Sequence, residues 1–457
     1  MDNGRDNART CCIIAYGCAK NQVDAQEMAS RLRAAGYRLS TDPAEADAVI
    51  VHTCGFIEDA KRESVEGILR ACDVAKDKGP HTEQRPRVLV TGCLSQRYPK
   101  ELLQEIPEIA AVAGTAAPRD IVEIVEAALA GHRVERVGAP GRGAPGKGIR
   151  LEPVSMGSVW SYLRVSEGCR HHCTYCAIPS MRGLLVSRTP VDIVDEAQSL
   201  VDAGVRELNL IAQDLSDYGY DLAGKRQLAS LLRKLAGIPD VGWVRLLYLR
   251  PDGVTRELAE TMANPKVAPY VDLPVEHGSA RILRLMGRPG PDRVMRAVEM
   301  LRSCVPDIFI RTTVITGFPG ETEEDLGQTA NLLKAMRVHR VGVFPFSSEE
   351  GTPASRLPDP VPGEIARQRA EAIRKLGLDL ARRNSASLVG KDIPVLLAGP
   401  AIRPGYWLGR GPHQAPEVDG ATYVRATDAA GSLTGRRVTA TVTRAGILNL
   451  FAAYRGR

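Results

Sequence analysis

Residues 160–176 read "WSYLRVSEGCRHHCTYC", a run rich in aromatic and aliphatic residues followed by three cysteines within eight residues. The run has the composition of a β-strand, so the loop with Cys169, Cys173 and Cys176 is expected to follow a strand. Structural zinc sites use four ligands, and disulfides use cysteines in pairs. Three thiolates with no fourth beside them fit an iron–sulfur cluster with one iron left open to another ligand.

A zinc knuckle is the alternative for this loop, with His171 or His172 as the fourth ligand. The position of the loop argues against it, because such knuckles are rarely set on the first strand of a β–α series. We therefore expect both histidines to be loop residues that face solvent. Tyr175, between two of the cysteines, is expected to pack near a bound adenine or to shield the cluster.

From Trp160 onward, strand-like runs alternate with helical stretches. Six strands are expected, at residues 160–166, 206–214, 243–250, 270–277, 308–318 and 340–348. Helical stretches separate them, among them residues 189–204, 227–237, 292–304 and 322–337. Six β–α units are too few for the usual closed barrel of eight strands. We therefore expect an α/β fold of the partial (β/α)6 barrel type, with its active face at the carboxyl ends of the strands.

Residues 10–125 show a separate β–α–β–α–β pattern, which predicts a flavodoxin-like parallel α/β domain. Each of its first three apolar runs is followed by a cysteine: Cys18, Cys54 and Cys93. Open parallel sheets bind ligands outside the carboxyl ends of their strands, so the three thiols are expected to meet in one crevice. The alternative is three buried structural cysteines, since free cysteine is often buried.

The remaining segments complete the expected domain organisation. Residues 131–150 are rich in glycine, proline and arginine and are typical of a flexible linker. A helix is expected at residues 363–390, and short strand-like pieces broken by glycine and proline predict a small β-barrel after it. The expected domains are an N-terminal domain at 9–125, a linker at 126–158, a core at 159–386 and the small barrel at 387–457.

The composition is that of a soluble globular protein of 457 residues, 44% of them hydrophobic and 25% charged. We expect a cytoplasmic location and no membrane contact, because the polar N-terminus has no signal segment and no apolar run is long enough to span a membrane. The net charge is +6, and residues 388–457 hold nine lysines or arginines against four acidic residues. This basic end favours an acidic or nucleic-acid partner; a solvated basic face is the alternative.

The motif "GCRHHCTYC", residues 168–176, resembles the signature of the radical S-adenosylmethionine (SAM) superfamily. The stretches "GCAKNQVD", "HTCGFIEDA", "TGCLSQRYP" and "IPSMRGLLVSR" resemble a narrower group, the methylthiotransferases, and within it the RimO branch, over nearly the whole chain. The resemblance implies an enzyme that inserts a methylthio group at the β-carbon of an aspartate in protein twelve of the small ribosomal subunit. It also implies a TRAM-like C-terminal barrel that contacts the substrate, with RNA contact as an option.

By the same resemblance, the six cysteines hold two 4Fe–4S clusters and are all catalytic. Cys18, Cys54 and Cys93 are expected to hold one cluster, and the loop cysteines Cys169, Cys173 and Cys176 the cluster that cleaves SAM. Two SAM molecules are implied, one as the source of a radical and one as the methyl donor. A reducing electron-donor protein is implied as a partner.

Further residues are expected to line the SAM pocket. The stretch "TTVITGFPGET", residues 312–322, resembles the strand and glycine-rich turn that superfamily members place against adenine and ribose; a tight turn alone is the alternative. Arg182 is expected to bind the SAM carboxylate or a substrate acid, or to cap the cluster loop. The expected cofactor-binding residues are Tyr175, Arg182, Gln213, Arg245, Thr313, Gly317 and Phe346.

Four positions depart from the family pattern: Leu184, Arg250, Glu276 and Gly278. They replace an acid, an aromatic residue, a glutamine and an apolar residue, and the C-terminal tail also lacks the acidic end of the RimO branch. None is expected to touch the six cysteines, and several fall where a substrate would approach the barrel. Methylthiolation of another peptide, or of transfer RNA as in the sister branch similar to MiaB, is therefore an alternative. An alternative of another class is a non-catalytic iron–sulfur or zinc protein that binds RNA.

Overall fold

The computed structural model describes residues 8–77, 86–140, 158–426 and 432–454, so much of the expected linker, residues 141–157, lies outside the described residues. The chain divides into two compact units. The first comprises the N-terminal part together with residues 164–172 and 176–192, and the second comprises residues 155–163, 173–175 and 193–457. Among the described residues, no helix is long and apolar enough to cross a membrane.

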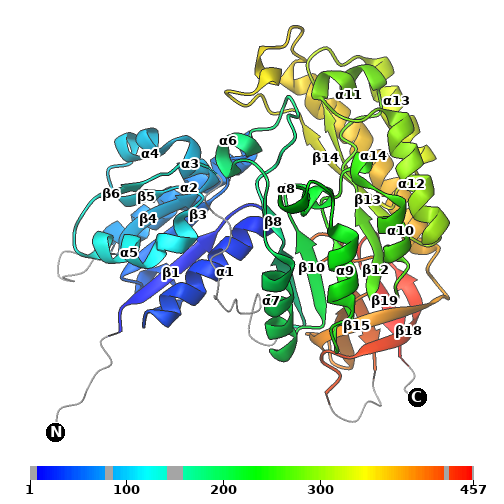
Figure 1. Cartoon of the computed structure of the whole chain (residues 1–457), viewed down its shortest axis with the longest axis horizontal. Helices are drawn as coiled ribbons and strands as arrows, with labels where there is room; N and C mark the ends of the chain where they lie inside the picture. The colour runs from blue at the N-terminus through cyan, green and yellow to red at the C-terminus, as the bar shows by residue number, and fades with distance from the viewer. Residues whose placement is uncertain (1–7, 78–85, 141–157, 427–431, 455–457) are drawn as a thin grey trace. The chain divides into compact units, whose positions relative to one another are not determined.

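A parallel sheet of six strands forms the centre of the first unit (Figure 1). Its order is β2 (Arg38–Ser40), β1 (Thr10–Ala15), β3 (Ala48–Thr53), β4 (Arg87–Gly92), β5 (Ile109–Ala113) and β6 (Val134–Arg136). The central strand β3 is buried along its whole length, which explains its apolar sequence. This is the strand order of flavodoxin-like folds, which place a ligand crevice where the order reverses, between β1 and β3. The predicted parallel α/β domain is confirmed.

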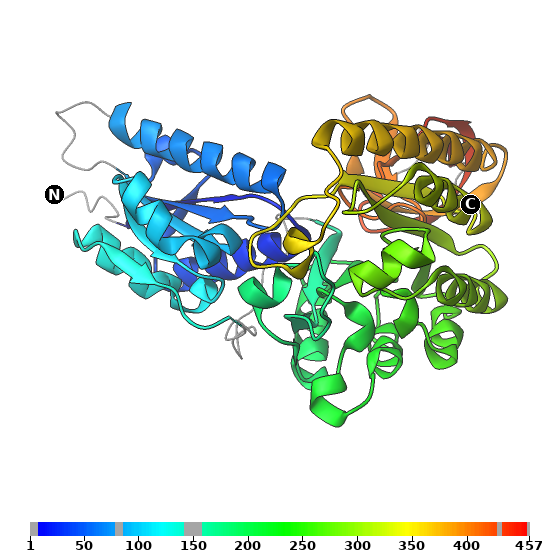
Figure 2. The same ribbon diagram turned by 90° about the horizontal axis from the view of Figure 1, so that it is seen from above.

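Helices cover both faces of this sheet (Figure 2). Helices α1 (Ala19–Ala34) and α5 (Ala117–Leu129) pack on one face, and α2 (Glu58–Asp77) and α4 (Pro99–Glu105) pack on the other. In α5 the buried residues Ile121, Ile124, Val125 and Ala128 recur at helical spacing, so one stripe of the helix faces the sheet. Helix α3 (Cys93–Arg97) begins directly where β4 ends.

The second unit is built on another sheet of six parallel strands. Its order follows the chain: β7 (Trp160–Arg164), β10 (Glu207–Ile211), β11 (Trp243–Leu246), β12 (Val267–Asp272), β13 (Phe309–Thr316) and β14 (Arg340–Pro345). The helices that separate these strands include α7 (Pro190–Asp202), α9 (Leu228–Ala236), α10 (Arg256–Met262), α12 (Pro291–Cys304) and α13 (Glu323–Ala335). The sheet remains open, and the predicted partial barrel is confirmed.

Strand β12 differs from its prediction, because it begins at Val267 and ends at Asp272 instead of spanning residues 270–277. Pro274 has no N–H to donate to a neighbouring strand, which ends the regular pairing. Glu276 then adopts a φ of +70°, a conformation that strands exclude. Glu276 pairs with the sheet through an isolated β-bridge to Val314 of β13.

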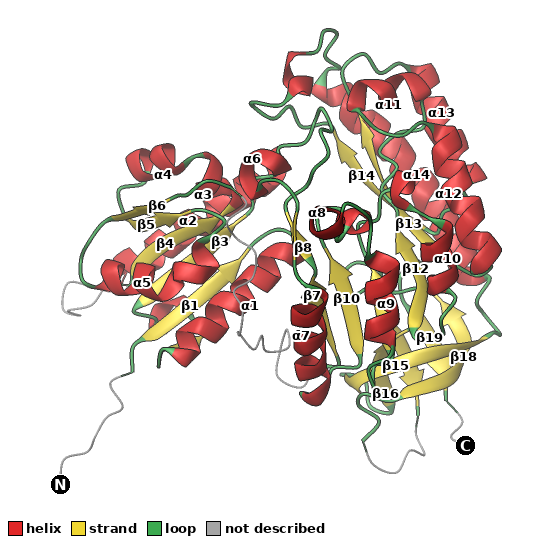
Figure 3. Ribbon diagram, viewed as in Figure 1, coloured by secondary structure: helices red, strands yellow, loops and turns green. Residues whose placement is uncertain are grey.

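Helix α14 (Gly363–Ala386) leads into a closed barrel of five strands, drawn in yellow near the C-terminus in Figure 3. The strands are β15 (Asp392–Pro400), β16 (Tyr406–Arg410), β17 (Thr422–Arg425), β19 (Leu450–Ala453) and β18 (Arg437–Ala445). Val395, Leu397, Val424 and Val442 fill its interior. The predicted small barrel is confirmed; its last strand, β19, was not among the predicted pieces.

Buried ionic and polar contacts attach this barrel to the sheet of the same unit. Glu207, the first residue of β10, accepts hydrogen bonds from Arg245 Nε at 2.8 Å and Arg410 Nη2 at 2.7 Å. Arg340, the first residue of β14, donates to the carbonyl of Ile447 at 2.8 Å. Glu207 and Arg340 are each the first residue of a strand. The small barrel is therefore attached at the amino-terminal side of the sheet.

Replacing Glu207 with alanine is expected to destabilise the second unit by about 3–5 kcal/mol, because two buried guanidinium groups lose their carboxylate. Urea denaturation measures this, with Glu257→Ala in an exposed ion pair with Arg233 as the matched control. Burial alone would raise the pKa of Glu207, but Arg410 and Arg245 lower it. The stabilisation should therefore be complete above the ordinary glutamate pKa of about 4.3 and be lost as the pH falls. Equal effects of the two variants would contradict this account.

Candidate iron–sulfur sites

Three cysteines of the first unit lie where β1, β3 and β4 end. Cys18 caps the amino end of α1, Cys54 directly follows β3, and Cys93 is the first residue of α3. Cys54 and Cys93 are buried, whereas Cys18 is exposed. Burial, together with the charges of Cys18 and Cys93, raises the pKa of the Cys54 thiol to about 12. The structure therefore places the three cysteines after strands β1, β3 and β4, on the edge of the sheet where the crevice is expected.

Glycines beside these cysteines allow the three strand ends to approach one another. A Cβ atom on Gly17 would lie 2.6 Å from the Cβ and 3.0 Å from the Sγ of Cys54. A Cβ atom on Gly55 would lie 2.8 Å from the backbone nitrogen and Cα of Leu94. Gly92, before Cys93, has a φ of +104°, which glycine adopts at no steric cost. Glycine at these positions therefore leaves a cradle in which the thiols can share one ligand.

The donor set of this cradle fits an iron–sulfur cluster. Cys18, Cys54 and Cys93 form no disulfide, so their sulfur atoms can serve as ligands. Buried thiols that lie near one another lose their protons with difficulty, because burial and neighbouring negative charge both disfavour the thiolate. A bound metal centre provides positive charge that stabilises the thiolates. Thiolates select soft metals, iron–sulfur clusters among them. Cys11 and Cys12, within β1, instead belong to the apolar cores on the two faces of the sheet.

Replacing Gly55 with alanine should damage this cradle, because the new methyl group would overlap the backbone of α3. We expect a loss of about 1–3 kcal/mol in stability, typical of overpacking, and a lower iron content after reconstitution. Thermal unfolding and iron analysis measure the two effects. Gly138→Ala is the matched control, since nothing lies within 4 Å of its added Cβ. Unchanged iron in both variants would contradict the proposed role of Gly55.

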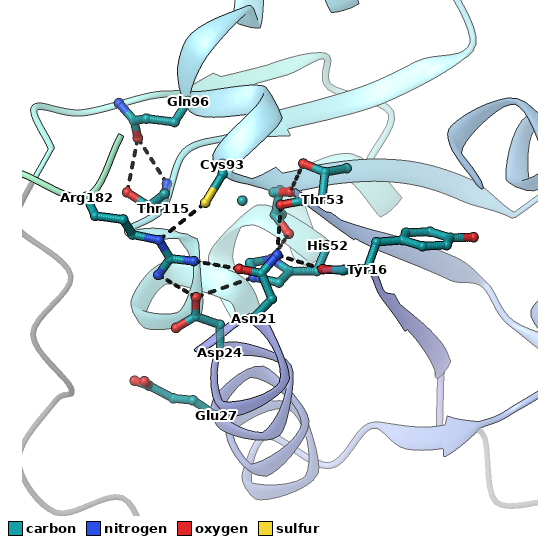
Figure 4. Close-up of polar contacts among 12 residues, drawn as sticks. Tyr16, Asn21, Asp24, Glu27, His52, Thr53, Cys93, Gln96, Thr115 and Arg182 are labelled. Atoms are coloured by element: carbon teal, nitrogen blue, oxygen red, sulfur yellow. Dashed lines mark hydrogen bonds and ion pairs between the residues drawn. The ribbon is translucent and has the colours of Figure 1, made fainter. Parts of the chain in front are cut away.

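Side chains that sequence reasoning missed hold the cysteine-bearing turns in place. The amide nitrogen of Asn21 donates to the carbonyls of Tyr16 at 2.7 Å and Thr53 at 3.0 Å, which joins the ends of β1 and β3 (Figure 4). Ser64 Oγ accepts from the N–H of Cys54 and donates to its carbonyl, both at 3.0 Å. The spacing of Asn21, one helical turn after Cys18, was the signal available in the sequence.

Arg182, one of the expected cofactor-binding residues, lies beside a cysteine of the N-terminal set. It is the last residue of α6 (Ile178–Arg182), and its Nε lies 3.3 Å from the Sγ of Cys93. Its other nitrogens donate to Asn21 and Asp24 within the first unit. The guanidinium is thus bound within the surroundings of Cys93.

The loop with Cys169, Cys173 and Cys176 lies between β8 (Ser166–Glu167) and α6. Its first turn is fixed within the first unit, because the N–H of Cys169 donates to the carbonyl of Gly183 at 3.1 Å. A Cβ on Gly168 would lie 2.0 Å from the carbonyl oxygen of Leu184, so only glycine fits there. The side chain of Leu184, one of the departures from the family pattern, is exposed.

Cys173, in the second unit, lies beside two arginines. Arg250 Nη1 is 3.2 Å and Arg288 Nη1 is 4.0 Å from its Sγ. The expectation that no departure from the family pattern touches a cysteine is therefore wrong for Arg250, whose side chain reaches across from the segment after β11. Glu276, another departure, lies 3.7 Å from Arg288. Two guanidinium groups therefore place positive charge beside this loop cysteine.

Aromatic residues pack next to this loop in the second unit. Tyr175 and Phe346 contact one apolar cluster that includes Phe318, and the rings of Phe318 and Phe346 meet edge to face at 5.2 Å. The hydroxyl and backbone of Thr174 hold the loop, donating to Leu285 and Met286. Two of the expected cofactor-binding residues, Tyr175 and Phe346, are therefore brought together.

The other expected cofactor residues are spread over the second unit. Thr313 lies in β13, and Gln213 follows β10. Gly317 has a φ of +75°, and a Cβ on it would lie 2.2 Å from that of Ala366, so the packing of α14 already requires glycine there. Arg245 is bound to Glu207 and to the carbonyl of Pro412 in the small barrel.

Comparison with known proteins gives a family for all three parts of the chain. The model of the Radical SAM superfamily matches residues 163–333, that of Uncharacterized protein family UPF0004 matches residues 10–114, and that of the TRAM domain matches residues 389–454. The chain is 42% identical over 450 residues to the ribosomal protein uS12 methylthiotransferase RimO of Desulforudis audaxviator, covering 97% of both chains. It is 41% identical to that of Moorella thermoacetica, covering 93% of this chain and 96% of the relative.

The chain belongs to the RimO family of radical SAM methylthiotransferases.

Two solved structures have a fold similar to that of this RimO family member. The radical SAM methyltransferase TsrM from Kitasatospora setae, solved with cobalamin and a [4Fe-4S] cluster, superposes with a TM-score of 0.54 at 15% identity, covering 76% of this chain and 77% of TsrM. The cobalamin-dependent SAM radical enzyme OxsB gives a TM-score of 0.51 at 12% identity, covering 81% and 56%. At such identities the similarity concerns the fold alone.

Proposed function

We propose that this protein inserts a methylthio group at the β-carbon of an aspartate in ribosomal protein uS12, with two 4Fe–4S clusters and two molecules of SAM. The observation that carries the proposal is the placement of six cysteines in two sets within a RimO family chain. One set meets at three strand ends, and the other lies on one loop after the first strand of the partial barrel. The enzyme is proposed to act in the cytoplasm and to receive electrons from a reducing protein partner.

The two cysteine sets divide the chemistry. Cys169, Cys173 and Cys176 would hold the cluster that cleaves SAM, and Cys18, Cys54 and Cys93 would hold the cluster that supplies the sulfur. The residues around each set hold the ligand cysteines in place. Arg250 and Arg288 do this for Cys173, and the glycine cradle does it for Cys54 and its two neighbours.

The small barrel is proposed to contact RNA while the ribosomal substrate is modified. Leu408, Tyr423, Phe451 and Arg444 are direct neighbours across four adjacent strands of that barrel. The rings of Tyr423 and Phe451 stack at 5.3 Å, and the Arg444 guanidinium lies 4.0 Å from the centre of the Phe451 ring. Stacked aromatic residues beside arginine are typical of surfaces that bind unpaired bases. This row also supports the second candidate, methylthiolation of transfer RNA.

A reconstitution assay separates the two candidates. The purified protein, with both clusters restored under anaerobic conditions, is given SAM, a reductant, and either a uS12 peptide with its aspartate or transfer RNA. The proposal predicts a methylthio mass gain on the aspartate of the peptide, and no gain when that aspartate is replaced by asparagine. A mass gain on transfer RNA alone would replace the proposed function by the second candidate.

A further inference from the structure

Arg182 contacts a cysteine that the proposed function assigns to the N-terminal cluster. Its Nε lies 3.3 Å from the Sγ of Cys93, within range of a hydrogen bond to sulfur. Arg182 is 2% exposed and Cys93 5% exposed. Water therefore screens the charge of the guanidinium from the sulfur only weakly.

The remaining nitrogens of Arg182 are bound by acceptors on α1 (Figure 4) and by one acceptor on β8. Nη2 donates to Asn21 Oδ1 and Nη1 donates to Asp24 Oδ2, both at 2.7 Å. Glu167 Oε1 lies 3.4 Å from Nη1. Asn21 is itself fixed between β1 and β3, as described above. The guanidinium is therefore held in one orientation, with its Nε–H directed at Cys93.

Carboxylates balance the guanidinium groups of this network, whose buried charged members are Asp24, Glu27, Glu167, Arg164 and Arg182. Burial alone would raise the pKa of Asp24, but Arg182 and Arg164 hold it well below its ordinary value. Asp24 therefore stays negative and offsets part of the positive charge of Arg182. The two residues act on Cys93 with opposite sign.

We propose that Arg182 is a positioning residue that raises the reduction potential of the cluster held by Cys18, Cys54 and Cys93, and that Asp24 limits this rise. The inference rests on the proposed function, which supplies the cluster. Reduction adds one negative charge to the cluster. A hydrogen bond to a ligand sulfur and a nearby positive charge stabilise that more negative form, so both raise the potential.

An anaerobic redox titration followed by electron paramagnetic resonance tests this inference. The full chain is used in a Cys173→Ala background, so that the N-terminal cluster gives the signal. Arg182→Lys replaces a planar set of donors by one ammonium group, so the potential should become more negative. We expect about a tenfold change in the one-electron equilibrium, which corresponds to about 59 mV. Asp24→Asn removes the opposing charge and should shift the potential in the positive direction.

Arg164→Lys is the matched control, because Arg164 is an equally buried arginine whose bonds run to Asp24, Glu27 and Glu167. Opposite shifts for Arg182→Lys and Asp24→Asn, with a much smaller shift for the control, support the inference. An unchanged potential in Arg182→Lys with normal iron content overturns it, and so does a shift of the same sign in all three variants. If Arg182→Lys binds no cluster, the sign of the Asp24→Asn shift decides.

The iron content of the protein distinguishes a failure of the proposed function from a failure of the inference about Arg182. If the parent protein holds no more iron than its Cys54→Ala variant, the N-terminal cysteines bind no cluster and the proposed function fails. If the parent holds the second cluster and its potential does not respond to Arg182, only the inference about Arg182 fails.

Discussion

Alanine at Cys173 is expected to abolish the reductive cleavage of SAM by the reconstituted protein. Loss of a residue outside the ligand shell of a metal site costs about 10–100-fold, so loss of a ligand should cost more, on the order of 10³-fold. Cys173 is also the cysteine that Arg250 and Arg288 approach, at 3.2 Å and 4.0 Å from its Sγ. The amount of 5′-deoxyadenosine formed under reduction is the measurement.

Cys304→Ala is the control for this experiment, since Cys304 ends α12 and belongs to neither set of cysteines. It should form 5′-deoxyadenosine at the rate of the parent. If the parent itself forms none, the protein is a non-catalytic iron–sulfur or zinc protein. Cleavage at an undiminished rate by Cys173→Ala would contradict the assignment of the loop cysteines.

Alanine at Cys54 is expected to have a different effect: 5′-deoxyadenosine still forms, but no methylthiolated product appears. Cys54 lies against Gly17 and belongs to the N-terminal set, so its loss removes the cluster that supplies sulfur and leaves the loop cysteines unchanged. Iron content should fall from two clusters to one. The measurement combines iron analysis, 5′-deoxyadenosine and the mass of the uS12 peptide in one reaction series.

The same Cys304→Ala protein controls for the loss of a thiol as such. Retained methylthiolation in Cys54→Ala would contradict the role of the N-terminal set. Loss of both activities with an intact fold would show that the two clusters do not have separate roles. In that case both sets of cysteines would be needed together for SAM cleavage and for sulfur insertion.

The sequence was sufficient to predict the elements that carry the chemistry. Cys18, Cys54 and Cys93 each follow an apolar run, and the carboxyl ends of parallel strands meet at one edge of a sheet, so their convergence could be expected. The six strands of the partial barrel could be found for the same reason, since buried parallel strands are nearly continuous apolar runs. The end of β12 was missed, because apolar residues continue past Asp272 while Pro274 and Glu276 end the pairing.

Long side chains were the part that the sequence could not place. Arg182, Arg245 and Arg250 were all near expected strand or loop ends, yet they bind Cys93, Glu207 and Cys173 respectively. An arginine reaches several ångströms from its backbone, and its partner depends on which buried acceptor needs a charge. Gly317 shows a similar limit, because its glycine is explained by contact with Ala366, a residue 49 positions later in the chain. Only the packed structure shows these pairs.

The most direct test of the proposed function is peptide mass spectrometry of uS12 from cells of the host with and without this gene. The account predicts one methylthio group on an aspartate of uS12, lost on deletion and restored by the intact gene. The Cys173→Ala and Cys54→Ala genes should both fail to restore it. A methylthio group that persists in the deletion strain, or an aspartate that is unmodified in both strains, would contradict the assignment of uS12 as the substrate.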